Sequence, residues 1–169
     1  MSIKPNGFWE GFNIRDQGMA NNLRWLIRYK YPRSKIIVWA ASGHIARKYP
    51  IKPARTKVHV MGEWLARDTA LKHSTYSIGF TPLEGRAGRI GKLFYNIPVP
   101  KKESFESWIA TMNPDYAFVD FKGFRALRKN YKRRFYMNGV SNGNIKFDWT
   151  NVFDGMFYIK EMYPCNGKK

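Results

Sequence analysis

The residues best suited to chemistry gather around one histidine. His44 follows the apolar run 35–40 and sits behind three small residues, Ala41, Ser42 and Gly43. An imidazole titrates near neutral pH and can take a proton from water or from a hydroxyl. Small neighbours would let a substrate approach the backbone closely. On position alone, a loop histidine hydrogen-bonded for structural reasons remains an open alternative.

A serine nucleophile beside this histidine is not favoured. A nucleophile elbow reads G-x-S-x-G, whereas Ser42 is flanked by Ala40 and His44 at the glycine positions. Two residues within one loop are also poorly placed to form a Ser–His pair. We therefore keep Ser42 only as a residue that could line the site.

A second candidate is Glu84, at the start of the glycine-rich stretch 84–92. Glycines with interleaved cations can cradle an anion. The spacing G-x-x-G-x-x-G is, however, neither a Walker loop nor a dinucleotide fingerprint, so a flexible connection is the simpler interpretation. A carboxylate at the end of a strand could orient a histidine or bind a substrate hydroxyl, and this is the role we predict for Glu84.

Metal and thiol chemistry find little support. Cys165 is the single cysteine, so no internal disulfide can form, and no Cys/His spacing suggests zinc. We interpret Cys165 as an ordinary tail position. The sequence predicts neither a cofactor nor a metal site.

The elements that must position these residues alternate along the chain. Helical spacing begins at Asn13, and Pro32 limits that helix, while four consecutive apolar residues, Ile36–Trp39, predict a buried central strand. Alternation of this kind predicts an α/β protein with a largely parallel sheet flanked by helices and a more β-rich C-terminal end. The expected helices cover 13–32, 58–65 and 103–112, and the expected strands cover 35–40, 74–81, 92–99, 116–121, 133–140 and 154–161.

These elements would bring distant residues to one place. In parallel sheets, ligands bind beyond the carboxyl ends of the strands. His44, Glu84 and the stretch 120–123 each follow an expected strand. We therefore hypothesise one site to which all three contribute.

Charge is the other outstanding property of the chain. Thirty Lys and Arg against twelve Asp and Glu give a net charge of +18 over 169 residues. Nucleic acid, an anionic membrane surface or an acidic partner are candidates for such a chain. No RNP1 pattern, KH loop or zinc knuckle supports the first of these.

No apolar stretch approaches the ~20 residues of a membrane span. Aromatic residues make up 17% of the chain, which excludes a disordered protein.

Three stretches together resemble the erythromycin esterase family. They are RDQGMANNLRWLIRYKYPRSKIIVWAASGHIAR, MGEWL and YSIGFTPLEG, which span about residues 13–85. The resemblance implies a metal-independent hydrolase in which a histidine activates water to open a macrolide lactone, helped by carboxylates and a second histidine. His44 matches the last histidine of the family's V-W-A block. The residues that match its preceding helix are Arg15, Asp16, Met19 and Asn22.

The chain also departs from the family pattern. Ala41 stands where many members carry an additional histidine. The family is about twice as long, and its expected general base and partner glutamate lie in an N-terminal half. The resemblance therefore implies that 1–169 is a single α/β domain corresponding to the C-terminal half of such a protein. An acidic N-terminal half would account for the charge of +18, and we expect docking of that half or self-association.

The leading hypothesis is a fragment of an erythromycin-esterase-like hydrolase, acting on a small ester or macrolide lactone and inactive on its own if half of the site is elsewhere. His44 would be the acid/base or orienting residue, with Glu84 and Arg15 in support. One alternative is a basic module that binds nucleic acid or an anionic surface. Another is a non-catalytic interaction domain of the same fold. No signal peptide is recognisable near Met1, so we expect a cytoplasmic protein.

Overall fold

A computed structural model describes residues 7–51, 56–88, 93–131 and 133–164. The chain divides into two compact units, Met1–Ser77 and Ile78–Lys169. The expected single domain over 1–169 stays a prediction. Cys165 and part of the glycine-rich stretch, 89–92, lie outside the described residues.

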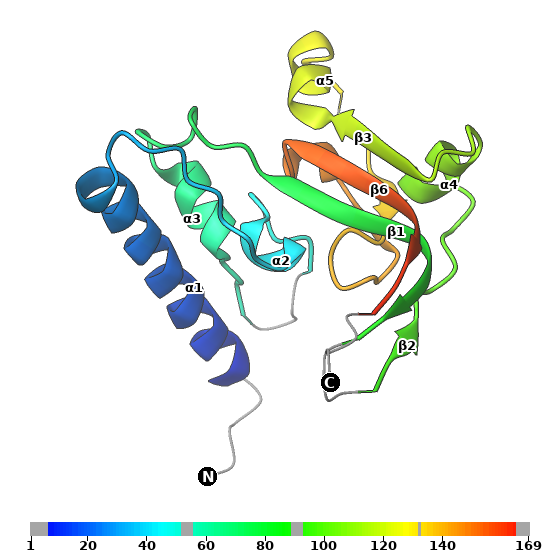
Figure 1. Cartoon of the computed structure of the whole chain (residues 1–169), viewed down its shortest axis with the longest axis horizontal. Helices are drawn as coiled ribbons and strands as arrows, with labels where there is room; N and C mark the ends of the chain where they lie inside the picture. The colour runs from blue at the N-terminus through cyan, green and yellow to red at the C-terminus, as the bar shows by residue number, and fades with distance from the viewer. Residues whose placement is uncertain (1–6, 52–55, 89–92, 132, 165–169) are drawn as a thin grey trace. The chain divides into compact units, whose positions relative to one another are not determined.

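The first unit is built on a long helix, α1 (Gly7–Trp25), which continues into the π-helical turn η1 (Leu26–Lys30) (Figure 1). The helix begins at Gly7, so the predicted start at Asn13 is wrong. Its buried residues, Asp16, Ala20 and Leu23, follow the i, i+4, i+7 spacing of one helical face. That face therefore carries a carboxylate among apolar side chains.

Two short helices pack against this face. They are α2 (Ser42–Ile45) and α3 (Met61–Arg67). Gly62 permits close contact between them, because an added Cβ would lie 2.6 Å from the carbonyl oxygen of Ala46. The shared core consists of Ala20, Leu23, Met61, Leu65 and Leu71, the first two from α1.

The prediction of a buried strand at 35–40 is wrong. The segment pairs with no strand of the described chain. Ile36 and Ala40 pack on the core, but the side chains of Ile37 and Trp39 are 91% and 86% exposed. Four consecutive apolar residues predict burial on both faces of a strand, but Ile37 and Trp39 do not share the burial of Ile36 and Ala40.

The second unit contains a four-stranded sheet of β1 (Ile78–Ala87), β2 (Tyr95–Asn96), β3 (Tyr116–Asp120) and β6 (Gly155–Met162), in the order β2-β1-β6-β3. The α/β class and the sheet flanked by helices are confirmed. The sheet is mixed rather than largely parallel, because β1 and β6 are parallel while the β1–β2 and β3–β6 pairs are antiparallel. Apolar runs identify central strands but do not encode their direction. Strand β2 lies at one edge of the sheet, within the expected strand 92–99, where Pro98 has no amide hydrogen to donate to a ladder.

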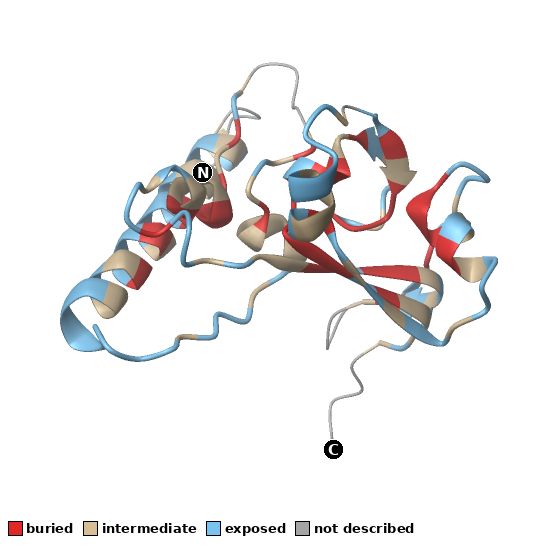
Figure 2. Cartoon of the chain, turned by 90° about the horizontal axis from the view of Figure 1, so that it is seen from above, coloured by how far each residue is buried: buried red, intermediate tan, exposed pale blue. Residues whose placement is uncertain are grey.

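One face of this sheet is covered, and Figure 2 shows buried residues along its strands. The covering elements include α4 (Phe105–Ala110), which Ser104 caps by accepting a hydrogen bond from the amide of Ser107 at 3.1 Å. The remaining elements are α5 (Phe121–Leu127), β4 (Phe135–Met137), β5 (Ile145–Phe147) and η2 (Trp149–Asn151). Strand β5 lies between the expected strands 133–140 and 154–161, where no strand was predicted. On the other face, the ring of Phe157 stacks on Phe80 of β1 and contacts Phe118 of β3 at a tilt of 49°.

A buried carboxylate links α4 to the sheet. Glu106 is fully buried, and its Oε1 accepts hydrogen bonds from the hydroxyl of Thr81 and from the amide of Asn138, the latter at 2.7 Å. Its Oε2 has no hydrogen-bond partner among the described residues. Burial raises the pKa of Glu106 above its ordinary value of 4.5.

This raised pKa predicts a pH-dependent stability. The folded state holds the proton of Glu106 more tightly than the unfolded state, so the stabilisation is complete below pH 4.5 and is lost as the pH rises through the folded pKa. Glu106→Gln should flatten the fall in unfolding free energy with rising pH, measured by urea denaturation. Asp115→Asn, at a carboxylate whose side chain is 79% exposed, is the control. An unchanged pH dependence in Glu106→Gln would contradict the assignment.

Candidate active site

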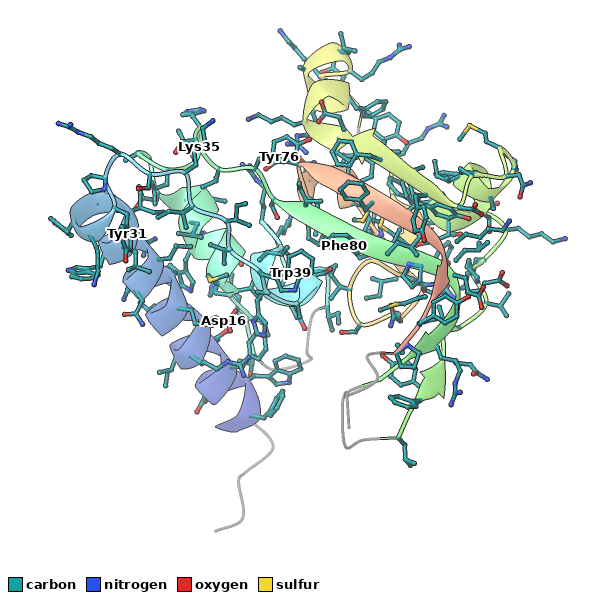
Figure 3. The ribbon with its side chains drawn as sticks, in the orientation of Figure 1. Asp16, Tyr31, Lys35, Trp39, Tyr76 and Phe80 are labelled. Carbon is teal, nitrogen blue, oxygen red and sulfur yellow. The ribbon has the colours of Figure 1, made fainter. Side chains whose placement is uncertain are left out.

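The site of the first unit is organised around a buried carboxylate. Asp16 is completely inaccessible to solvent on α1. Its Oδ2 accepts a hydrogen bond from Nδ1 of His44 at 2.8 Å and another from the backbone amide of Met61 at 2.9 Å. Burying a carboxylate is costly unless such donors replace water. The position of Asp16 therefore ties α1 to α2 and α3 at once, and Figure 3 labels it on α1.

The two hydrogen bonds of the His44 ring determine which ring nitrogen carries the proton. Nη2 of Arg15 lies 3.1 Å from Nε2 of His44. A guanidinium can only donate, so Nε2 must accept, and the ring proton is assigned to Nδ1, where it bonds Asp16. In this arrangement the lone pair of Nε2 faces Arg15, and it could accept a proton once the arginine moves away.

Arg15 and Phe12 complete the surroundings of the imidazole. The ring of Phe12 stacks on His44 with 5.3 Å between centroids and an interplanar angle of 20°. The guanidinium of Arg15 lies 5.1 Å from the centroid of Phe12 and 3.7 Å from Oδ1 of Asp16. The side chain of Arg15 is 57% exposed, whereas that of His44 is 23% exposed. The arginine is therefore the solvent-side member of the cluster.

A second polar residue of α1 fixes the approach to α3. Asn13 donates from Nδ2 to the carbonyl of Lys57 at 2.8 Å and accepts at Oδ1 from the amide of His59 at 2.8 Å. The sequence analysis treats Asn13 only as the start of a helix, so this function was missed. A detectable signal was its i, i+3 spacing from Asp16, which puts two polar side chains on one helical face.

An aromatic cluster borders the site on α1. Tyr49 packs against Trp9 and Phe12, with ring centroids 6.4 and 6.0 Å apart. Burial, assisted by the negative charge of Asp16, raises the pKa of Tyr49 above its ordinary value of 10.0. The Tyr49 hydroxyl is therefore protonated at neutral pH.

The other predicted site residues are distributed more widely. Met19 packs against the core, and Asn22 is exposed on α1. Ser42 begins α2, two residues before His44. Glu84 belongs to the second unit and lies inside β1 opposite Glu161 of β6, so its expected place at the end of a strand is wrong. Its role, like those of the other predicted site residues, stays a prediction.

The chemistry available to this cluster is proton transfer. A carboxylate that binds Nδ1–H orients the ring and stabilises the imidazolium formed when Nε2 takes a proton.

The described residues contain no group of three or more His, Cys, Asp or Glu side chains that could hold a metal ion. Nor do they contain a helix long and apolar enough to cross a membrane. Fold and cluster together define an α/β protein with a carboxylate-oriented histidine.

Comparison with known proteins gives the family. The model of the family described as erythromycin esterase matches residues 4–162, and the chain belongs to this family. A protein of Bacillus subtilis (strain 168), named "Putative hydrolase YbfO", is 32% identical over 117 residues, which is 65% of this chain and 26% of that protein.

Solved structures show the same fold. A Bacillus cereus protein aligns with a TM-score of 0.69 at 17% identity, over 94% of this chain and 40% of its own. A mutant of the erythromycin esterase EreC in its open conformation aligns with a TM-score of 0.62 at 17% identity, over 88% of this chain and 37% of its own. The chain thus spans about a quarter of its curated relative and about two fifths of these solved chains.

The geometry predicts what loss of the carboxylate does. Asp16→Asn replaces one carboxylate oxygen by an NH2 group, while two donors, Nδ1–H of His44 and the amide of Met61, face this position. If the NH2 group faces His44, the Nδ1–H proton loses its acceptor. If it turns away, the carbonyl oxygen that remains is a neutral and weaker acceptor. We expect nitrogen NMR of the imidazole at neutral pH to show the proton on Nδ1 in the parent protein and a redistribution toward Nε2 in Asp16→Asn. Asp115→Asn serves as control, and an Nε2–H tautomer in the parent protein would contradict the assignment.

Proposed function

We propose that this chain supplies the histidine part of a hydrolase site that cleaves an ester or lactone by water attack. A hydrolase-type function is supported by family membership and by the relative named as a hydrolase. The observation that carries the finer proposal is the Asp16–His44 hydrogen bond of 2.8 Å, with Nε2 directed to the exposed side of the pair.

The proposed reaction begins when water and the substrate carbonyl replace Arg15 at Nε2. The imidazole of His44 takes a proton from the water while the water oxygen bonds to the carbonyl carbon. Asp16 stabilises the resulting imidazolium, and Arg15, released from Nε2, can donate to the oxyanion. When the tetrahedral intermediate collapses, the carbon–oxygen bond to the alcohol breaks and His44 returns the proton to that oxygen.

The substrate class follows from the surroundings and from the family. The aromatic rings of Trp9, Phe12 and Tyr49 offer apolar contact for the body of an ester, and the erythromycin esterase relative makes a macrolide lactone the first cyclic candidate. Because the chain covers 26–40% of its relatives, we propose that the complete site includes further residues of the longer fold. The proposed supporting residues are Arg15, Met19, Asn22, Ser42 and Glu84.

The experiment compares histidines within the first unit. We expect His44→Ala to lower kcat/KM for an activated phenyl ester by about 10²–10⁴-fold, because it removes the proton acceptor. His73→Ala is the matched control, since His73 is an exposed histidine of the same unit. An erythromycin lactone in a parallel assay separates macrolide hydrolysis from general ester hydrolysis. A rate that His44→Ala leaves unchanged would contradict the role of His44.

A further inference from the structure

We propose that Asn13 is a positioning residue for the Asp16–His44 pair. It holds the segment 57–61 in the register in which the amide of Met61 fixes the plane of the Asp16 carboxylate. That carboxylate in turn orients the ring of His44. All of these groups belong to the first unit. The consequence for catalysis rests on the proposed function, whereas the positioning itself does not.

The segment 57–61 is extended and leads into α3, which lies beside α1 (Figure 1). Residues 56–60 belong to no helix or strand of the described chain, and Val60 has the extended dihedral angles φ −101° and ψ 162°. The side chains of Val58 and Val60 are buried, whereas Lys57 is exposed and His59 is intermediate. This alternation is typical of an extended chain, in which the backbone polar groups of every second residue point to the same side.

Three backbone groups of the odd-numbered residues meet α1 in this way. The carbonyl of Lys57 and the amide of His59 both bond the side-chain amide of Asn13, each at 2.8 Å. The amide of Met61 bonds Oδ2 of Asp16 at 2.9 Å. The side chain of Asn13 therefore pairs with both of its backbone partners as a neighbouring strand would, and it leaves neither bond to water.

The spacings of the helix and of the extended segment match. Amides two residues apart in an extended chain are separated by about 6.6 Å. Side chains three residues apart on a helix, such as Asn13 and Asp16, have their Cβ atoms about 5–6 Å apart. Since both side chains bond one side of the same segment, the register set at His59 determines where the amide of Met61 lies.

The Asp16 carboxylate depends on that amide for its orientation. Oδ1 has no hydrogen-bond partner among the described residues, so the printed bonds of the carboxylate both lie at Oδ2. One donor alone would leave the carboxylate free to turn about its Cβ–Cγ bond. Two donors from different elements, His44 of α2 and Met61 of α3, fix its plane. Loss of the Met61 amide would therefore loosen the acceptor of His44.

A second contact carries the same register to the helix of His44. Gly62 follows Met61 directly, and an added Cβ there would lie 2.6 Å from the carbonyl oxygen of Ala46, the residue after α2. A shift of the segment 57–61 would thus disturb both the acceptor of the imidazole and the end of the helix that carries it.

Arg24 of α1 makes a contact that separates positioning from simple attachment. Its guanidinium donates to the carbonyl of Trp64 at 2.7 Å and to Asp68 at 3.0 Å, so it also ties α1 to α3. Arg24 lies eight residues after Asp16, or about 12 Å along the helix. Its loss should weaken the packing of the two helices without touching the bonds at Oδ2.

The test compares Asn13→Leu with Arg24→Met in the full chain by NMR at neutral pH. In Asn13→Leu we expect hydrogen exchange at the Met61 amide to accelerate about tenfold or more. Its proton signal should move upfield, because a bond to a carboxylate is lost. The two nitrogen signals of the His44 imidazole should move closer together, since Asp16 then holds Nδ1–H for only part of the time.

Arg24→Met is the matched control. It should lower Tm, because two bonds between the helices are lost, and leave the signals of Met61 and His44 as in the parent protein. Asn13→Ser keeps one polar group and should change the same signals in the same direction by less, and it decides the matter if Asn13→Leu does not fold. Unchanged His44 nitrogen signals in the Asn13 variants, or equal changes in Arg24→Met, would overturn the proposal.

Hydrolysis of the activated phenyl ester tests the catalytic consequence separately. We expect Asn13→Leu to lower kcat about tenfold or more with KM unchanged, because the orientation of His44 matters only as the proton moves. An unchanged kcat would overturn this consequence. A parent protein without activity contradicts the proposed function, and the NMR signals then still decide the positioning. An active parent with unchanged His44 signals in Asn13→Leu contradicts the positioning alone.

Discussion

The first unit depends on the cost of placing one negative charge out of reach of water. Asp16 meets that cost with two hydrogen bonds at Oδ2, one from His44 of α2 and one from the amide of Met61 at the start of α3. Removal of either donor would leave a buried carboxylate short of partners. The same two bonds at Oδ2 also fix the helices and orient the ring of His44, while Oδ1 has no hydrogen-bond partner among the described residues. The packing of the helices and the orientation of the histidine therefore depend on the same contacts.

The second unit deals with its own buried carboxylate differently. Glu106 receives hydrogen bonds from Thr81 and Asn138, neither of which is a cation, and its pKa is raised by burial. A neutral acid can link α4 to β1 without a counterion. Asp16, by contrast, has Arg15 3.7 Å away and a histidine bonded to it. Glu106 is thus a carboxyl group that serves packing, whereas Asp16 lies among groups that can transfer protons.

Sequence reasoning reached the α/β class, the family and the helix that carries Asp16, because periodicity and patterns of residue type are local. It reached the positions of α3, β3 and β6 for the same reason. It failed at Ile36–Trp39, because a run of apolar residues predicts burial but does not indicate which element packs on each side of it. It also missed the bridging role of Asn13 and the Met61 amide, since backbone donors carry no signature in a sequence. Strand direction was likewise not encoded, and the sheet proved to be mixed.

The sequence separations of the Asp16 bonds have a consequence for folding. Asp16 lies 28 residues from His44 and 45 residues from Met61. Two loops of different length must close before the carboxylate has both donors, and each closure costs chain entropy before any contact repays it. A nascent or locally unfolded chain thus has a histidine with ordinary solvent exposure and no defined tautomer. Proton chemistry at His44 is in this sense a property that the chain acquires only on completing its tertiary structure.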